Sequence, residues 1–289
     1  MKPAPSPALQ QLLLGLRWTR ASYWLMSSFL AVIALIIVVW WPLVVDYFAL
    51  YDPDLPPWVQ LDWLLIGIFA LMSVLIMAGA DLKADARIVL VGLAGGLVIE
   101  SWGTQTNLWT YYTLERPPLW IIPAWPIASL SIDRLYRLLD RSLPRKPRLE
   151  SALYWTMLLG FYGLMLWFVW PTRGLSLTVM ALGLCAFLIL TPRQPRAMLL
   201  TFVAGAGLGY FLERWGTTRS CWTYYTLQTP PVFAVLAHGM AAVAFWRAGM
   251  LFDVLPLLFA RFLPGEVKAS RSRVRIHLSG RPAAPDDGR

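Results

Sequence analysis

The sequence predicts an all-α integral membrane protein of eight transmembrane helices, built as two parallel four-helix repeats with the N- and C-termini in the cytoplasm. Three observations predict this fold: eight separated apolar stretches, an unequal distribution of Lys and Arg between alternate loops, and one motif written twice. Of the 289 residues, 58% are hydrophobic and 14% are charged, and a soluble domain carries roughly twice that share of charge. The apolar excess lies in the eight stretches, so it does not form the core of a large globule.

Each stretch approaches the length of about 20 residues that a helix needs to cross about 30 Å of hydrocarbon, although the third and fourth are short. The predicted helices cover residues 24–45, 63–80, 87–102, 118–133, 152–171, 175–192, 197–214 and 231–252. In the third helix, Arg87 is expected to mark the inner boundary. Glu100 then lies about 20 Å along the axis, within the depth of the outer leaflet.

Lys and Arg predict the orientation of these helices. Of the 25 basic residues, 21 lie on the side of the N-terminus, and the other four are Arg116, Arg173, Arg214 and Arg219. Basic residues gather in cytoplasmic loops, so we expect a multi-pass protein of the cell (plasma or inner) membrane with the motif loops on the extracytoplasmic side. Most of the 16 tryptophans fall near the predicted outer interface, which agrees with this orientation.

The expected organisation has four segments. They are a cytoplasmic N-terminal segment (1–22), the first repeat (23–136), the second repeat (137–262) and a basic disordered cytoplasmic tail (263–289). Leu9–Arg20 could form a short helix on the inner surface. The net charge of +9 flanks the apolar stretches and fills the tail, which predicts attraction to anionic lipid, with a specific partner site as the alternative, and no binding to nucleic acid. Cys185 and Cys221 are expected to be free thiols.

The duplication appears on shifting the sequence by 113 residues. The segments that match are Glu100-Ser-Trp102-Gly-Thr-(4)-Trp109-Thr-Tyr111-Tyr112-Thr-Leu-(2)-Pro117-Pro118 and Glu213-Arg-Trp215-Gly-Thr-(4)-Trp222-Thr-Tyr224-Tyr225-Thr-Leu-(2)-Pro230-Pro231. Twelve of these 19 positions are identical, too many rare residue types for chance, and this indicates an internal repeat. Four helices in each repeat give both repeats one orientation, as in transporters with parallel repeats.

Glu100 and Glu213 are candidate catalytic residues because ionisable groups within a membrane are costly and are usually functional. Gly92 and Gly96 precede Glu100 at intervals of four, and Gly205 and Gly209 precede Glu213 in the same way. Such smooth helix faces allow close contact, so the carboxyls should point into the bundle and face one another across a pseudo-two-fold axis, in a shared cavity that opens outward. A structural role, accepting hydrogen bonds from the motif's own Thr, Tyr and Trp, is the alternative.

The aromatic residues of the motif are candidate substrate-binding residues. They are Trp102, Trp109, Tyr111, Tyr112, Trp215, Trp222, Tyr224 and Tyr225. An interfacial belt would explain aromatic residues at this depth, but it does not require the same order and spacing twice. His238, which aligns with Trp125, is a third candidate catalytic residue as a proton relay to Glu213, with a structural hydrogen bond as the alternative. One His and scattered acids predict no metal and no cofactor.

The pattern of a Glu at a helix end, Gly and Trp-x-Tyr in the loop and a Pro-bearing helix, all duplicated, resembles the integral membrane carotenoid-biosynthesis proteins of the lycopene-cyclase-domain and carotenoid hydratase type. The resemblance covers roughly 80 residues in two blocks. It implies acid–base roles for Glu100 and Glu213 and pocket roles for Trp109, Tyr111, Trp222 and Tyr224. The cyclase pattern also has Pro-x-Glu-Glu on the next helix, where this chain has Pro123-Ala-Trp-Pro126 and Leu236-Ala-His-Gly239.

The sequence therefore predicts a membrane-embedded enzyme that performs acid–base chemistry on an isoprenoid or carotenoid-like lipid, as a cofactor-independent lyase, isomerase or hydratase. A protonated carboxyl can protonate an alkene, and indole and phenol rings stabilise the cation that forms. The expected partners are membrane lipid and a hydrophobic small-molecule substrate. A proton-coupled transporter or lipid-moving protein, or a non-catalytic membrane scaffold, is the alternative.

Overall fold

A computed structural model describes residues 17–191 and 194–262 of the chain. The predicted tail (263–289) and most of the predicted surface helix Leu9–Arg20 lie outside these residues. The chain divides into two compact units, Met1–Gly249 and Met250–Arg289. The features described below belong to the first unit, except for the end of the last helix.

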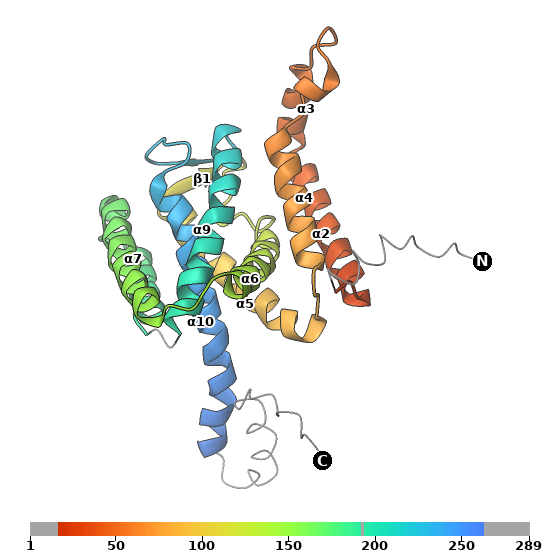
Figure 1. The fold of residues 1–289 in the computed structure, drawn as a ribbon. Coiled ribbons are helices and arrows are strands. Elements are labelled where there is room, and N and C mark those ends of the chain that lie inside the picture. The colour runs from red at the N-terminus through yellow and green to blue at the C-terminus, as the bar shows by residue number, and fades with distance from the viewer. Residues whose placement is uncertain (1–16, 192–193, 263–289) are drawn as a thin grey trace, which may run out of the picture. The chain divides into compact units, whose positions relative to one another are not determined.

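The described part of the chain is mostly helical (Figure 1). The long elements are α2 (Arg20–Val39), α3 (Trp41–Ala49), α4 (Trp63–Met77), α5 (Leu82–Gln105), α6 (Ala124–Ser142), α7 (Pro147–Phe168), α8 (Ser176–Ile189), α9 (Pro195–Thr218) and α10 (Val232–Phe262). Short 3-10 helices cover Pro57–Val59 (η1) and Trp170–Thr172 (η2), and two strands cover Trp109–Tyr111 (β1) and Trp222–Tyr224 (β2). Every predicted helix thus overlaps an observed one, but several ends differ.

Four helices of the described chain are long and apolar enough to cross a membrane, namely α2, α7, α9 and the Val232–Phe252 part of α10. The apolar helices α4 and α8 are shorter, with 15 and 14 residues. Large apolar side chains remain on the outer surface, such as Leu159 of α7 and Met180 of α8, which are 66% and 68% exposed. An exposed surface this apolar suits lipid better than water, and it indicates a membrane protein.

The first predicted helix, 24–45, is two helices, which corrects the sequence prediction. Trp40 ends α2 and begins α3, with φ −91° and ψ 15°, outside the helical range. Pro42 sits in the first turn of α3. A proline has no N–H to donate and its ring crowds the carbonyl four residues earlier, so a helix bends or breaks just before it.

The third predicted helix begins five residues earlier than expected. Asp81 caps α5 because its carboxylate accepts hydrogen bonds from the backbone N–H groups of Lys83 and Ala84, at 3.0 and 3.3 Å, and such a cap fixes a helix start. Arg87 consequently lies inside the helix and does not mark its boundary. At about 1.5 Å per residue, Glu100 lies about 27 Å from the start of α5, further along the axis than the sequence suggested.

The fourth predicted helix, 118–133, is displaced toward the C-terminus and becomes α6. Pro118 and Pro123 hold the chain in turns before it, because the residue that precedes a proline avoids the helical conformation. At its other end, Arg137 pairs with Asp133 one turn away at 2.9 Å, and such spacing supports an exposed helix. The polar last turns of α6 therefore continue to Ser142.

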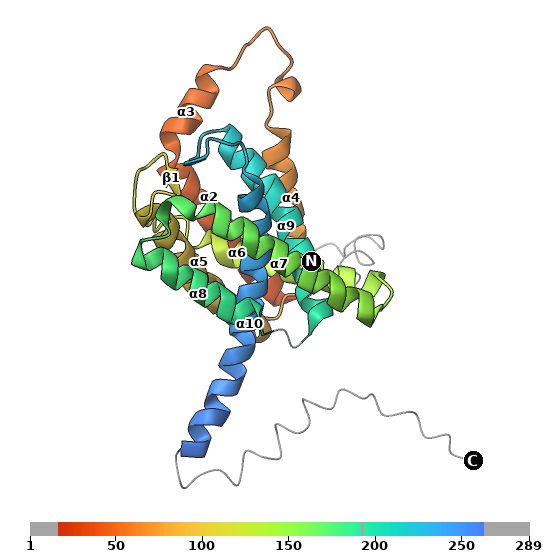
Figure 2. The same ribbon diagram turned by 90° about the vertical axis from the view of Figure 1, so that its left-hand side faces the viewer.

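The amphipathic helix α6 lies at the centre of the packing. It contacts α4, α5 and α9, while α2 lies along α4 and α7 along α9 (Figure 1, Figure 2). A buried apolar cluster joins α2, α4, α6, α9 and α10 through Phe29, Ile68, Met72, Ile76, Met77, Ile127, Leu130, Ile132, Ala204, Leu208 and Ala242. Side chains from both parts of the sequence meet in this cluster, so helices from the two parts share one core.

The two copies of the motif pair as antiparallel strands. Trp109 lies opposite Tyr224, and Tyr111 lies opposite Trp222. Two further backbone hydrogen bonds extend the pairing, from Tyr112 to the Cys221 carbonyl and from Tyr225 to the Leu108 carbonyl, both at 3.1 Å. Sequence alone did not predict these strands, because three residues are too few to show the alternation by which a strand is recognised.

The loops around the strands have matching backbones. Asn107 and Ser220, 113 positions apart, have positive φ of 58° and 55°, and Leu114 and Leu227 have 61° and 58°. A left-handed conformation costs an L-residue such as Leu roughly 1–2 kcal/mol. Strain of this kind persists only where the surroundings hold the chain in place, so both loops are held by their contacts.

Candidate functional site

The carboxylate of Glu100, on α5, is enclosed by three hydrogen-bond donors. Trp109 Nε1 donates to Oε2 at 3.0 Å, and the Tyr111 hydroxyl donates to Oε1 at 2.9 Å. Trp125 Nε1, on α6, also donates to Oε1, at 3.1 Å. Glu100 is only 3% exposed, so these bonds replace the water that the buried carboxylate has lost.

The carboxylate of Glu213, on α9, has the equivalent surroundings. Trp222 Nε1 donates to Oε2 and the Tyr224 hydroxyl donates to Oε1, both at 2.9 Å. The third partner is His238 of α10, whose Nε2 lies 2.8 Å from Oε1. Glu213 is also 3% exposed. We call these sets the Glu100 half-site (Glu100, Trp109, Tyr111, Trp125) and the Glu213 half-site (Glu213, Trp222, Tyr224, His238).

Glycines let the third partner of each carboxylate approach. A Cβ at Gly96 would lie 2.4 Å from Cγ of Trp125, and one at Gly209 would lie 2.4 Å from Cβ of His238. Carbon atoms that are not bonded do not come this close, so any larger residue would move α6 or α10 away. The predicted close helix contact is therefore present, and it delivers the partner side chain to each carboxylate.

The Gly and Thr that follow Trp102 and Trp215 in the motif also have a packing role. A Cβ at Gly103 or Gly216 would lie 1.9 Å from the indole ring of Trp109 or Trp222. The hydroxyl of the Thr that follows donates to the carbonyl of the glutamate one turn earlier, at 2.6 Å in both copies. The spacing of the motif thus lets the loop fold back over its own helix and place an indole N–H on the carboxylate.

Strand pairing brings the two half-sites against each other. The rings of Trp109 and Tyr224 have centroids 5.9 Å apart, and so do those of Tyr111 and Trp222. Each ring pair contains one donor to Glu100 and one donor to Glu213. The donors of the two carboxylates therefore form a shared wall of aromatic rings, and both carboxylates are buried.

The third partners also meet. The Trp125 indole and the His238 imidazole stack with centroids 5.9 Å apart and an angle of 15° between their planes. These residues align in sequence and differ in chemistry. An indole N–H only donates, whereas an imidazole donates, accepts and exchanges a proton near neutral pH. Of the two half-sites, only the Glu213 half-site has a third partner that can take up or release a proton.

Two of the predicted pocket residues have other partners. The Tyr112 hydroxyl donates to the carbonyl of Val39, at the end of α2, and the Tyr225 hydroxyl donates to that of Phe168, at the end of α7, at 2.7 Å. Both bonds satisfy carbonyls that a helix end leaves without a partner. These tyrosines fasten the motif loops to neighbouring helices and do not touch the carboxylates.

Trp102 and Trp215 also direct their indole nitrogens elsewhere. Trp102 Nε1 donates to the Thr178 hydroxyl at 3.3 Å, and Trp215 Nε1 donates to Asp62 Oδ2 at 2.8 Å. The Trp102 ring still packs edge-on against Trp109, with centroids 5.8 Å apart. Trp102 therefore supports a ring that contacts Glu100, whereas the Trp215 ring stacks on Trp40, with centroids 5.5 Å apart.

Sequence reasoning missed three aromatic residues near the Glu100 half-site. Trp125 was seen only as the position that aligns with His238, and that alignment was the signal that could have placed it on Glu100. Trp120 packs edge-on against Tyr111, and Trp40 packs against Trp120, both with centroids 5.4 Å apart. The Nε1 atoms of Trp40 and Trp120 are buried without an acceptor, which leaves two N–H donors available inside an aromatic cluster.

The two tyrosines that contact the carboxylates remain protonated. Burial raises the pKa of Tyr111 and of Tyr224 well above the ordinary value, and the neighbouring carboxylates, Glu100 and Glu213 respectively, raise it further. Each phenol therefore keeps its proton and donates it in a hydrogen bond.

The donor set of the site does not resemble a metal centre. Within the described residues, His, Cys, Asp and Glu form no group of three that could hold a metal ion. The arrangement is instead that of two carboxylates surrounded by N–H and O–H donors and aromatic faces. Comparison with known proteins does not extend this description, since no protein-family model, curated protein or solved structure matches the chain.

Proposed function

We propose that this chain is a membrane-embedded enzyme that performs acid–base chemistry on an isoprenoid or carotenoid-like lipid, with Glu213 and His238 as the proton-exchanging pair. The observation that carries the proposal is the 2.8 Å contact between His238 Nε2 and Glu213 Oε1, buried within a wall of aromatic rings. A general acid or base needs a group that changes protonation near the working pH, and histidine is the side chain that does so most readily.

The proposed step balances with this pair alone. A proton moves from the His238–Glu213 pair to one carbon of a C=C bond, and positive charge develops on the other carbon. The π faces of Trp and Tyr rings stabilise such a cation. Loss of a proton from the adjacent carbon back to the pair gives the isomerised alkene. Alternatively, the oxygen of a water molecule bonds to the cation and one of its protons returns to the pair, which gives the alcohol.

The Glu100 half-site supports this chemistry without exchanging protons. Trp125 occupies the position of His238, and an indole has no proton to give near neutral pH. We assign Glu100 the role of orienting the rings that the two half-sites share. The acceptor-free N–H groups of Trp40 and Trp120 would bind an oxygen atom of the substrate, because a buried donor without a partner costs about 1–3 kcal/mol.

The architecture that we propose around this site has eight spans in two parallel four-helix repeats, with both termini in the cytoplasm. The supporting observations are the predicted helices that overlap α2 to α10, the 113-residue motif shift and the unequal distribution of basic residues. In this arrangement the strand pair and both half-sites lie toward the extracytoplasmic side, within reach of a lipid that enters from the membrane.

Lipid analysis tests the proposal. Cells that make isoprenoids would express the wild type, a Glu213→Gln variant or a Glu115→Gln control, in which the changed residue is an exposed loop glutamate. Mass spectrometry of the extracted carotenoids and polyprenyl lipids should show a new or depleted species for the wild type and the control, but not for Glu213→Gln. Identical lipid profiles in all of these cells and in cells without the gene would refute the enzymatic proposal.

A proton-coupled transporter is the second candidate, since a titratable His–Glu pair between helices also suits proton transport. Cysteine labelling separates the two candidates. In a transporter, positions along α5 and α9 near the half-sites would react with impermeant reagents from each side of the membrane in turn. In an enzyme, they would react from one side or from neither.

A further inference from the structure

Two buried arginines occupy equivalent places in the sequence. Arg134 of α6 and Arg247 of α10 are 113 positions apart, and they are 7% and 6% exposed. Each one directs its Nε atom to an equivalent position near the end of a preceding helix. Arg134 donates to the carbonyl of Ala78 at 2.9 Å, and Arg247 donates to the hydroxyl of Thr191 at 3.1 Å.

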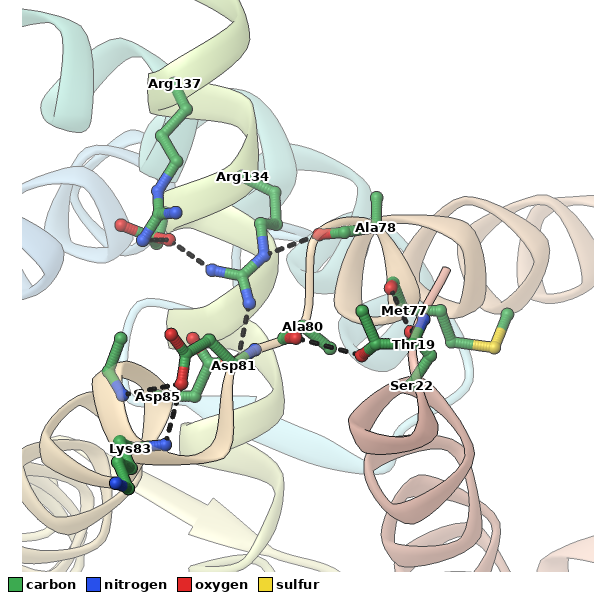
Figure 3. A network of polar contacts seen from close by, with 12 residues as sticks. Thr19, Ser22, Met77, Ala78, Ala80, Asp81, Lys83, Asp85, Arg134 and Arg137 are labelled. Carbon is green, nitrogen blue, oxygen red and sulfur yellow. Dashed lines mark hydrogen bonds and ion pairs between the residues drawn. The ribbon is translucent and has the colours of Figure 1, made fainter. Parts of the chain in front are cut away.

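Arg134 is fully neutralised by carboxylates (Figure 3). Its Nη2 atom pairs with Asp85 Oδ2 at 2.7 Å, and its Nη1 atom pairs with Asp133 Oδ2 at 2.5 Å. With the Ala78 carbonyl on Nε, all three nitrogens of the guanidinium have an acceptor. A buried guanidinium with this set of partners meets the condition under which buried charges are tolerated.

Arg247 lacks both of these carboxylates. The residue that corresponds to Asp85 is Met198, which is fully buried, and the residue that corresponds to Asp133 is Trp246. Within the described residues, no carboxylate lies within ion-pair distance of Arg247, and its terminal nitrogens make no hydrogen bond. Neither terminal nitrogen is among the fully enclosed atoms that lack a partner, so both keep some exposed surface.

An arginine side chain stays protonated in proteins, so a buried guanidinium keeps its positive charge. An uncompensated buried charge is costly, and so its counter-charge must come from a bound ligand. The two terminal nitrogens form a fork that matches two oxygens of a phosphate group. Basic positions between the ends of membrane helices are also where anionic lipid headgroups bind.

We propose that Arg247 and Thr191 form a binding site for an anionic phosphate group, carried by a membrane phospholipid or present as free phosphate. The bound group would supply the negative charge that Asp85 supplies to Arg134 in the first part of the chain. The proposal does not depend on the glutamate site or on its chemistry.

Lipid retention by the purified protein tests this site. The wild type would be stripped of lipid in detergent and incubated with phosphatidylglycerol, with phosphatidylcholine or with inorganic phosphate. Native mass spectrometry and thermal unfolding would be followed in each case. We expect retention of about one phosphatidylglycerol and a rise in Tm of a few degrees, since a ligand that binds only the folded state stabilises it. An equal rise with inorganic phosphate alone would assign the site to free phosphate.

Two variants and one control complete the test. Arg247→Gln should weaken phosphatidylglycerol binding about ten-fold, the loss expected for one charge-assisted contact. Met198→Asp should restore the internal carboxylate and exclude the ligand while the protein stays folded, so the test survives if Arg247→Gln fails to fold. Arg137→Gln removes a half-exposed arginine as the matched control. Unchanged retention in Met198→Asp, or no stabilisation of the wild type by any of the three probes, would overturn the proposal.

Discussion

The Glu100 and Glu213 half-sites hold their carboxylates by nearly the same contacts. In each, an indole nitrogen lies 2.9–3.0 Å from one carboxylate oxygen and a phenol lies 2.9 Å from the other. The third partner differs, being Trp125 in one half-site and His238 in the other. The same backbone thus supports one half-site whose donors are fixed and one that can exchange a proton.

Two buried arginines, Arg134 and Arg247, also keep a similar geometry but differ in their charged partners. Arg134 has two carboxylates, and Arg247 has a hydroxyl in place of a carbonyl and no carboxylate among the described residues. In both comparisons the helix contacts match while the polar partner differs. Differences between corresponding positions are therefore better guides to function in this chain than the shared motif itself.

The largest effect should come from removing either carboxylate. Glu100→Ala leaves Trp109, Tyr111 and Trp125 as buried donors without an acceptor, which should lower the free energy of unfolding by about 3 kcal/mol or more. Glu213→Ala should have an effect of similar size. Thermal unfolding in detergent measures this, with exposed Glu115→Ala as a control that should stay within about 0.5 kcal/mol. A small effect at Glu100 with a large one at Glu213 would contradict the structural equivalence.

The second-largest effect should come from the chemical difference between Trp125 and His238. His238→Trp copies Trp125 into the second half-site, so the hydrogen bond to Glu213 can persist while proton exchange is lost. Product formation should fall by about 100-fold or more, and Tm should change little. His277, the other histidine of the chain, lies outside the described residues, and His277→Trp serves as the control. Full activity of a folded His238→Trp enzyme would remove His238 from the mechanism.

A smaller, equal effect is expected from the two tyrosines that fasten the loops. Tyr112→Phe and Tyr225→Phe each remove one hydroxyl from a helix-end carbonyl, and each should cost about 1 kcal/mol of stability. Denaturation of both variants beside Tyr51→Phe, a control at an exposed tyrosine, measures the difference. A loss confined to one of the two tyrosines would show that the loops are held unequally.

The smallest effect concerns Cys221, which aligns with the buried Leu108. Burial raises the pKa of the Cys221 thiol to about 12, so little thiolate exists at pH 8 and alkylation should be slow. Cys221→Leu should change stability by less than about 1 kcal/mol, because the corresponding site already holds a leucine. Thr223→Cys, at an exposed neighbouring position, should react quickly in a background without the native cysteines. Rapid alkylation of Cys221 would show that the chain around β2 opens.

The sequence predicted the features that depend on residues close together in the chain. The apolar stretches located the helices, the glycine spacing predicted the inward faces of α5 and α9, and the motif's own Trp and Tyr were expected as donors to the carboxylates. The predicted helix ends were less accurate where a single capping residue or proline decides them, such as Asp81 before α5 or Pro42 in α3. The number of membrane crossings and the role of the site remain predictions.

Features made by distant residues could not be predicted. The β1–β2 pair joins segments whose three-residue strands carry no recognisable pattern. The Asp85–Arg134 pair unites two helices across 49 positions, and a charge in a helix does not show which partner it will find. The shared wall of rings depends on both features, so its geometry emerges only in the folded chain.

The partners of Glu100 lie nine, eleven and 25 residues after it, and this closeness has a consequence for synthesis. A chain that emerges from a ribosome into a membrane exposes each segment before later ones exist. The first carboxylate can be satisfied as soon as the loop and the start of α6 have followed it, without waiting for the second copy. Glu213 follows the same timing. Each carboxylate can therefore be shielded soon after its own helix is made, and strand pairing is left as a late joining step.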